Sequence, residues 1–134
     1  MYRLRKQFNF EAAHSLPLVP RDHPCFRVHG HSYSVVIEVG SEKLLDGFVI
    51  DFRKINEFAK PIVNEFDHQN LNDFVDNPTC ENLCSLIAQR FCESFRSSYE
   101  DVEVYDKSGL VYLLAVEVSE TPKTKCRLEL REEL

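Results

Sequence analysis

His23-Pro-Cys-Phe-Arg-Val-His-Gly-His-Ser-Tyr33 holds three of the five histidines of the chain and leads directly into an alternating apolar pattern. The alternation continues to about Gly40 and is typical of a strand with one buried face. His29 and His31 are two residues apart, so in an extended strand both project from the same face and one metal ion could contact both. A His-x-His pair is a weak signal alone, because hydrogen-bonded strand histidines are commoner and zinc needs at least one further protein ligand.

The segment from Tyr2 to His14 also alternates, and it places Phe8, Phe10, Ala12 and His14 on one face. His14 therefore ends an apolar row. Two explanations remain open for it. It caps a core strand with one nitrogen bonded to the backbone, or it supplies the third metal ligand, since a strand pairing with the one after His31 would bring it alongside.

The middle of the chain predicts a loop and two helices. Three prolines lie between Ser15 and Phe26, which favours a loop. Asp51 is a good N-cap for an amphipathic helix from Phe52 to about Phe66, with a kink expected at Pro61. A second helix is expected to start within Asn77-Pro-Thr-Cys-Glu-Asn82, with a cap residue and proline in its first turn. Its core face is formed by Leu83, Leu86, Ile87, Phe91 and Phe95.

Two further strands are expected near the C-terminal end. The first runs from Leu110 to Glu120, with Leu110, Tyr112, Leu114, Val116, Val118 and Glu120 on one side and a solvated Glu117 on the other. The second runs from Lys125 to Arg131 and has the charges of an edge strand. The polar stretch from Arg96 to Gly109 is expected to be a loop, with a strand start at 102–105.

This order predicts an α+β fold in which a four-stranded antiparallel sheet carries both helices on one face, as a single domain of residues 1–134. Open sheet edges favour association into a larger closed sheet.

Composition excludes several classes of function. The chain has 134 residues and a formal net charge of −6, which argues against nucleic acid as a partner. It contains neither an apolar run that could span a bilayer nor the apolar block of a signal peptide, so we expect a cytoplasmic protein without a membrane partner. Its five cysteines show no Cys-x-x-Cys unit, so free thiols are expected. Cys80 and Cys84 are one helical turn apart, and buried structural thiols explain them better than a metal site.

Several motifs in colinear order resemble the 6-pyruvoyl-tetrahydropterin synthase family, and most of all its bacterial branch, 6-carboxy-tetrahydropterin synthase of queuosine biosynthesis. They are Phe10-Glu-Ala-Ala-His14, His23-Pro-Cys25-x-x-x-His29-Gly-His31, Phe66-Asp67-His68-x-x-Leu71-Asn72, Asn77-Pro78-Thr79-x-Glu81-Asn82 and Val118-Ser-Glu120-Thr121. The resemblance implies a tunnelling fold whose subunits join their sheets into trimeric barrels, and two barrels that stack into a homo-hexamer with sites at the subunit interfaces.

The resemblance also implies roles for particular residues. His14, His29 and His31 would hold Zn2+, and Cys25 would be the catalytic base. Asp67 and His68 would assist proton transfer. Glu120 would anchor the pterin ring, with Thr79 and Cys80 lining its pocket. Cys80 departs from the pattern, because other members often have Ser or Thr there.

The expected reaction converts 7,8-dihydroneopterin triphosphate to 6-carboxy-5,6,7,8-tetrahydropterin, with release of triphosphate and acetaldehyde. Arg21, Arg27 and Lys107 are local cations that could meet the triphosphate, although each is more simply a solvated residue. Three alternatives remain: a 6-pyruvoyl-tetrahydropterin synthase, a hydroxymethyl-pterin branch with glutamate in place of the cysteine, and a non-catalytic zinc-stabilised pterin-binding oligomer. The three-residue gap between Cys25 and His29 favours the carboxy branch.

Overall fold

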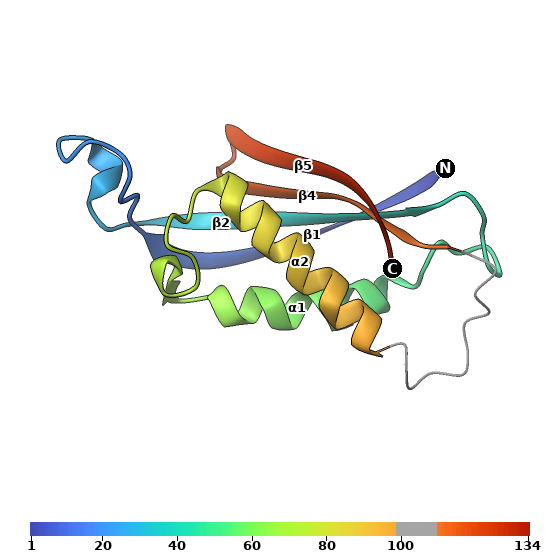
Figure 1. Ribbon diagram of the computed structural model, residues 1–134. Helices are drawn as coiled ribbons and strands as arrows, with labels where there is room; N and C mark the ends of the chain where they lie inside the picture. The colour runs from blue at the N-terminus through green and yellow to red at the C-terminus, as the bar shows by residue number, and fades with distance from the viewer. Residues whose placement is uncertain (99–109) are drawn as a thin grey trace.

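The computed structural model describes residues 1–98 and 110–134 and has two helices and five strands in those ranges. Figure 1 shows both helices on one face of a long sheet, and a loop of residues 15–28 that projects from one end. The elements are β1 (Tyr2–His14), the short turn η1 (Pro24–Phe26), β2 (His29–Ser41), α1 (Phe52–Phe66), β3 (Gln69–Asn70), the short turn η2 (Leu71–Asp73), α2 (Cys80–Ser98), β4 (Tyr112–Thr121) and β5 (Thr124–Glu133).

The sheet has the order β3-β1-β2-β4-β5. The pairs β1–β2, β2–β4 and β4–β5 are antiparallel, whereas the two-residue strand β3 runs parallel to β1. The prediction of an α+β fold with both helices on one face is confirmed. The prediction of four antiparallel strands was wrong in one respect, because β3 is too short to produce an alternating pattern in the sequence.

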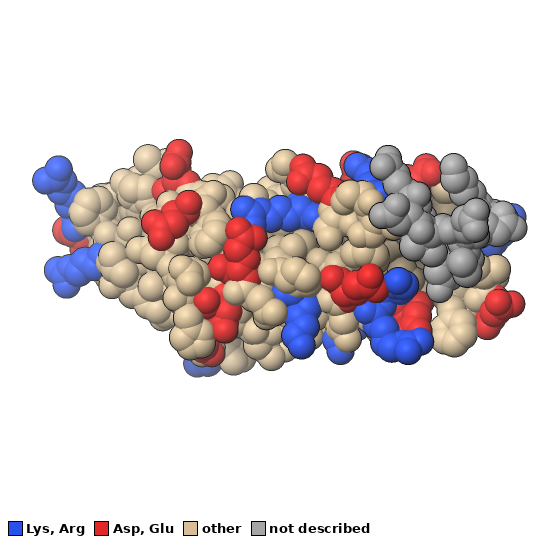
Figure 2. Space-filling model, turned by 90° about the horizontal axis from the view of Figure 1, so that it is seen from below, with Lys and Arg blue, Asp and Glu red and all other residues tan. Residues whose placement is uncertain are grey.

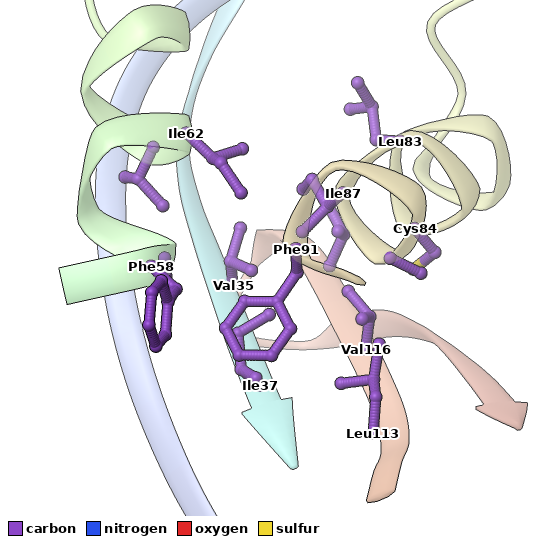
Figure 3. Close-up of a cluster of buried hydrophobic side chains, with 14 of the residues drawn as sticks. Val35, Ile37, Phe58, Ile62, Leu83, Cys84, Ile87, Phe91, Leu113 and Val116 are labelled. Carbon is purple, nitrogen blue, oxygen red and sulfur yellow. The ribbon is translucent and has the colours of Figure 1, made fainter. Parts of the chain in front are cut away.

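The hydrophobic core lies between the helices and the sheet. In Figure 3, Phe58 and Ile62 of α1 and Ile87 and Phe91 of α2 lie over Val35 and Ile37 of β2, with Leu113 and Val116 of β4 beside them. These residues recur at helical spacing in the helices and at every second position in β2, which is why each element has one apolar face. The core therefore holds β1, β2 and β4 rigidly against α1 and α2.

A bulge in β4 changes which residues face the core. The pairing of β4 with β5 shifts register between Leu113 and Ala115. Leu113 packs in the helix-side cluster with Val116 and Val118, so strict alternation is broken between them. The expectation that Tyr112 and Leu114 share a face with Val116 was therefore wrong, while the face predicted for Val118 and Glu120 holds.

The opposite face of the sheet carries an ion-pair network. Glu38 is 3 % exposed and Glu117 is 6 % exposed. Arg127 on β5 donates to both carboxylates at 3.0–3.1 Å, and Arg5 donates to Glu117 at 2.6 Å. The prediction of a solvated Glu117 was wrong, because arginine side chains from β1 and β5 lie over it. Hydrogen bonds and charge from Arg127, and then from Arg3, hold the pKa of Glu38 below its usual range.

Both helices start near the predicted positions, but the position of the proline in the second helix differs from the prediction. Asp51 caps α1 as predicted, by accepting from the Arg53 backbone N–H at 2.8 Å, and the helix continues through Pro61. Thr79 caps α2, since its hydroxyl accepts from the Asn82 N–H at 3.2 Å. Pro78 thus precedes the helix instead of lying in its first turn.

Neither helix of the described residues has the length and apolar character needed to cross a bilayer. Figure 2 shows acidic and basic side chains interspersed on the helix-covered face, with basic groups standing apart at the end where the loop 15–28 projects. The strand start expected at 102–105, and Lys107, lie outside the described residues.

Candidate functional site

Three histidine rings from β1 and β2 meet at one end of the sheet. The register pairs His14 with His29 and Ala12 with His31, so the three side chains share the helix-covered side. One ligand nitrogen from each ring lies within 4.8 Å of the others. The ring centroids of His14 lie 4.6 Å from His29 and 5.2 Å from His31. The sequence therefore predicted the cluster correctly, including the contribution of His14 from a separate strand.

Backbone carbonyls fix the orientation of two of the rings. The Pro78 carbonyl lies 2.8 Å from Nδ1 of His14, and the Arg27 carbonyl lies 2.7 Å from Nδ1 of His29. A carbonyl only accepts, so each Nδ1 carries the proton and each neutral ring presents a lone pair at Nε2. Burial, partly offset by the Pro78 carbonyl, lowers the pKa of His14 and favours this neutral form.

The Nε2 atoms of His14 and His29 face each other at a distance that suits a shared metal ion. Nε2 of His14 and Nε2 of His29 are 3.0 Å apart. Tetrahedral zinc with Zn–N bonds of 2.0–2.1 Å holds its nitrogens ~3.3 Å apart, close to this separation. Nε2 of His31 is buried and has no hydrogen-bond partner within the described residues. The donor set therefore fits a metal ion, and the three neutral imidazoles are a zinc set with an open position.

Glu120, at the end of β4, is next to the same histidines. One carboxylate oxygen lies 3.7 Å from Nε2 of His14 and the other 3.7 Å from Nε2 of His31. The Glu120 side chain is partly exposed, so a ligand can reach it from solvent. A carboxylate at this place can accept two N–H donors from a planar heterocycle beside the metal position.

Asp67 and His68 form a pair at the end of α1. Nδ1 of His68 lies 2.9 Å from Oδ2 of Asp67, and Oδ1 of Asp67 accepts from the Glu11 backbone N–H at 2.9 Å. The two adjacent side chains are therefore in direct contact. The bond from Glu11 and then the contact with His68 lower the pKa of Asp67, so this carboxylate is charged at neutral pH.

The backbone of His68 has an uncommon conformation that makes this pairing possible. Its φ is 60°, in the left-handed region that side chains disfavour. The His68 N–H donates to the Glu11 carbonyl at 2.6 Å, which begins the parallel contact between β3 and β1. Such strain is maintained only where surrounding contacts over-determine it, and it concentrates at functional sites.

An open pocket of about 570 Å³ lies against His31 and His68, while Glu120 is not among its lining residues. Residues of β1 and β2 and the segment 68–70 line it, including His31 and His68. A volume in this range accommodates a small heterocyclic ligand. One of the predicted metal ligands and one of the predicted proton-transfer residues therefore border the same space.

Cys25 lies apart from these groups, in the projecting loop. It sits in η1, where its carbonyl accepts from the Leu16 N–H at 2.8 Å and its own N–H donates to Nδ1 of His23 at 3.0 Å. The bond from Leu16, which is two residues after His14, holds the Cys25 backbone near the end of β1. The thiol is half-buried and does not belong to the cluster of metal-ligating atoms found among the described residues.

Thr79 and Cys80 lie where the N-terminus of α2 meets the cluster. The Thr79 hydroxyl is engaged as the helix cap. Burial, and then the charge and hydrogen bond of Glu120, raise the pKa of Cys80 to about 12, so this thiol is protonated at neutral pH. Cys80 is therefore a hydrogen-bond donor to Glu120 and is not a base.

The sequence reasoning missed two contributors to the site. The Pro78 carbonyl orients His14, and no residue type in the sequence signals the use of a main-chain oxygen. Tyr33 lies with its ring centroid 5.5 Å from that of His31, and its hydroxyl is buried without a hydrogen-bond partner within the described residues. Its place two residues after His31 in an alternating strand could have identified it.

A sheet end that brings together three histidines, the Glu120 carboxylate and an Asp–His pair defines a candidate metal-assisted enzyme site. The chain belongs to the 6-pyruvoyl tetrahydropterin synthase family, whose model matches residues 3–131. It is therefore one of the pterin synthases of that family.

Relatives and solved structures agree with this assignment. The 6-carboxy-5,6,7,8-tetrahydropterin synthase of Synechocystis sp. is 34 % identical over 114 residues, covering 79 % of this chain and 87 % of the relative. The dihydroneopterin monophosphate aldolase of Pyrococcus furiosus is 35 % identical over 88 residues, covering 66 % of this chain and 73 % of the relative. The 6-pyruvoyl tetrahydropterin synthase of Caenorhabditis elegans superposes with a TM-score of 0.72 at 21 % identity, covering 96 % of this chain and 95 % of that one, and shows the shared fold.

Proposed function

We propose that this protein uses Zn2+ to convert 7,8-dihydroneopterin triphosphate and water to 6-carboxy-5,6,7,8-tetrahydropterin, triphosphate and acetaldehyde. The observation that carries the proposal is the convergence of His14, His29 and His31 beside the Glu120 carboxylate. The Synechocystis relative, named as a synthase of this product, supports the choice of reaction.

The histidines would hold the zinc ion through their Nε2 atoms. The Pro78 and Arg27 carbonyls keep two rings in the required tautomer, so little reorganisation accompanies binding. When bound, the ion supplies a Lewis acid that polarises the hydroxyls of the substrate side chain and stabilises the negative charge produced by C–H deprotonation.

Glu120 would fix the pterin ring. A 2-amino-4-oxo pterin presents adjacent N–H donors, and the two carboxylate oxygens can accept both. A ring without those donors would leave the charge unpaired, which gives the site selectivity. Cys80 donates to the same carboxylate from the start of α2 and so restricts its orientation.

Cys25 would remove the proton from the substrate side chain, and the Asp67–His68 pair would take part in proton transfer. A thiol acts as a base only as its thiolate, and a nearby cation favours that form. Asp67 orients the His68 imidazole through the 2.9 Å contact with Nδ1. Cys25 is carried by a loop, so the substrate side chain would meet it from the opposite side to the rigid sheet.

The triphosphate would be met by arginines of the projecting loop. Arg21 and Arg27 are both exposed on the segment that bears Cys25, where Figure 2 shows basic groups at the end of the molecule. Guanidinium groups suit phosphate oxygens because they donate in a planar fork. Their positive charge would also favour departure of the triphosphate.

We further propose a homo-hexamer, built as two stacked trimers, in the cytoplasm. β5 is an edge strand, and β1 is paired on its outer side only over the two residues of β3. Such edges favour pairing with another copy. Light scattering after size exclusion should give six times the 15.6 kDa chain mass. A monomer at working concentration would contradict this part of the proposal.

The deciding experiment is product analysis. The zinc-loaded protein is incubated with 7,8-dihydroneopterin triphosphate, and the pterins, triphosphate and aldehydes are quantified. Equal amounts of 6-carboxy-tetrahydropterin and acetaldehyde are expected. A 6-pyruvoyl product without acetaldehyde would overturn the carboxy assignment and favour triphosphate elimination alone. No turnover, together with a closed cobalt site that has Cys25 as fourth ligand, would favour a zinc-stabilised binding protein.

The Pyrococcus relative favours one second candidate, a retro-aldol cleavage of the dihydroneopterin side chain. That reaction breaks the bond between the first and second side-chain carbons and gives a hydroxymethyl pterin with a phosphorylated glycolaldehyde. The same three histidines and base would serve it, because it too begins by removing a proton from the side chain. 7,8-Dihydroneopterin monophosphate as substrate, with detection of the hydroxymethyl pterin, separates the two reactions.

A further inference from the structure

The Tyr33 hydroxyl is a buried hydrogen-bonding group without a partner within the described residues. Tyr33 is 1 % exposed, and its hydroxyl and Nε2 of His31 are the two buried side-chain polar atoms that lack a partner in the described part of the chain. Leaving a buried hydroxyl unpaired is costly. Both orphan atoms lie at the histidine cluster, which indicates that this region is built to receive further groups.

The Tyr33 ring is held rigidly. It stacks on Phe10, its register partner on β1, with centroids 4.9 Å apart and planes inclined by 7°. His14 and His31 contact it edge-on, at 5.9 Å and 5.5 Å between centroids. The packing of the ring therefore fixes where the hydroxyl lies, without any hydrogen bond of its own.

Glu120 follows the last residue of β4 that pairs with β2. The register pairs Val35 with Val118 and Ser34 with Ser119, and continuing it by one residue would bring Glu120 opposite Tyr33. Directly opposed side chains on one face lie about 4.5–5.5 Å apart at Cβ. At present the Glu120 carboxylate lies near the histidine nitrogens, 3.7 Å from His14 and from His31.

We propose that Tyr33 is a positioning residue for the pterin ring: its hydroxyl donates a hydrogen bond to Glu120 when that carboxylate turns from the histidines to the N–H edge of the pterin. The inference rests on the proposed function, because it assumes that Glu120 binds the pterin. A carboxylate offers about four lone-pair sites, so it can accept from Tyr33, Cys80 and two pterin N–H groups together. A tyrosine hydroxyl carries its proton at neutral pH, so it is available as a donor.

The test is Tyr33→Phe, which keeps the stacked ring and removes only the hydroxyl. Calorimetric titration of the zinc-loaded protein with 7,8-dihydroneopterin should give an affinity about tenfold weaker than that of the wild type, as expected for the loss of one charge-assisted hydrogen bond. Zinc content should be unchanged. The melting temperature of the metal-free protein should be equal or higher, because the variant lacks the unpaired hydroxyl. Tyr112→Phe, the same substitution at a tyrosine of β4 remote from the histidines, is the matched control and should change none of these quantities.

A double-mutant cycle with Glu120→Gln tests whether the Tyr33 hydroxyl affects pterin affinity through Glu120. If Tyr33 acts through Glu120, the Tyr33→Phe change should have little effect in the Glu120→Gln background. An equal tenfold loss in both backgrounds would overturn the inference by showing that the hydroxyl contacts the ligand independently. Unchanged affinity with a lowered melting temperature would also overturn it. If 7,8-dihydroneopterin binds the wild type and Tyr33→Phe equally tightly, this inference alone is wrong. If it does not bind the wild type, the proposed function is contradicted as well.

Discussion

Nδ1 of His68 lies 2.9 Å from Oδ2 of Asp67, although the two residues are adjacent in the chain. The left-handed backbone of His68 turns its side chain back toward the carboxylate. Asp67→Asn keeps an oxygen for the Glu11 N–H but removes the charge, so turnover should fall about 10²-fold while the fold is retained. Initial rates and circular dichroism at neutral pH check this. A fully active variant would contradict the proton-transfer role.

The same pair gives a dependence on pH. The pKa of Asp67 is lowered from 3.8, so its bonds stabilise the fold fully above that value and are lost as the pH falls through the lower folded value. Thermal unfolding of wild type and Asp67→Asn should therefore differ most above pH 4 and converge in stronger acid. If the difference in melting temperature between the two proteins instead grew as the pH fell, the stabilising role of the charged Asp67 would be contradicted.

Removal of one histidine should abolish metal binding. His14→Ala leaves two ligands, and the zinc content after dialysis should fall to background, whereas His23→Ala, at an exposed histidine outside the cluster, should retain it. Zinc at about 100 times its dissociation constant should stabilise the wild type by ~2.7 kcal/mol and leave His14→Ala unchanged. Elemental analysis and thermal shift measure both, and zinc retained by His14→Ala would refute the assignment.

Cys25→Ala separates catalysis from metal binding. The thiol lies outside the metal cluster, so zinc should be retained while turnover drops by about 10²–10⁴-fold. Cys126→Ala, which removes a thiol from β5, should remain active. Loss of zinc together with activity in Cys25→Ala would show that the thiol is a ligand and not a base.

Glu120→Gln tests the pterin anchor. The glutamine amide places an N–H2 against the pterin donors, so affinity for 7,8-dihydroneopterin should fall about 10²-fold or more, with zinc content unchanged. Glu93→Gln, on the exposed face of α2, should bind as the wild type does. Calorimetry gives both affinities, and an unchanged affinity in Glu120→Gln would remove the anchor from the mechanism.

Arg127 should be a large contributor to stability. Arg127→Met leaves two buried carboxylates with fewer partners, which should destabilise the fold by ~3 kcal/mol at neutral pH. The pKa of Glu38 is lowered from 4.5, so the loss should shrink as the pH falls below that value and the carboxyls protonate. Lys54→Met breaks an exposed pair with Glu57 and should cost less than ~1 kcal/mol. Urea unfolding at neutral and acid pH gives the comparison.

Local patterns sufficed to predict much of the fold and the metal cluster. His14 is the last residue of β1 and His29 is the first residue of β2, so antiparallel pairing of the two strands brings these histidines together. Features that depend on distant partners were not predictable. The burial of Glu117 depends on Arg5, 112 residues away, and the β4 bulge at Leu113–Ala115 leaves no mark in an alternating sequence. The sequence places Tyr33 on the histidine face, but the lack of a hydrogen-bond partner for its hydroxyl within the described residues depends on how distant segments pack around it.

The register pair His14–His29 closes the segment 15–28 at its base. Residues can therefore be inserted into or deleted from this segment without displacing the histidines that flank it, and lengthening a loop adds only slowly to its entropic cost. The positions of Cys25 and of the loop arginines can drift over evolution while the spacing of the three histidines stays constant. Under the proposed function, a change of product between relatives would then need only a new loop length between two strands that keep their histidines.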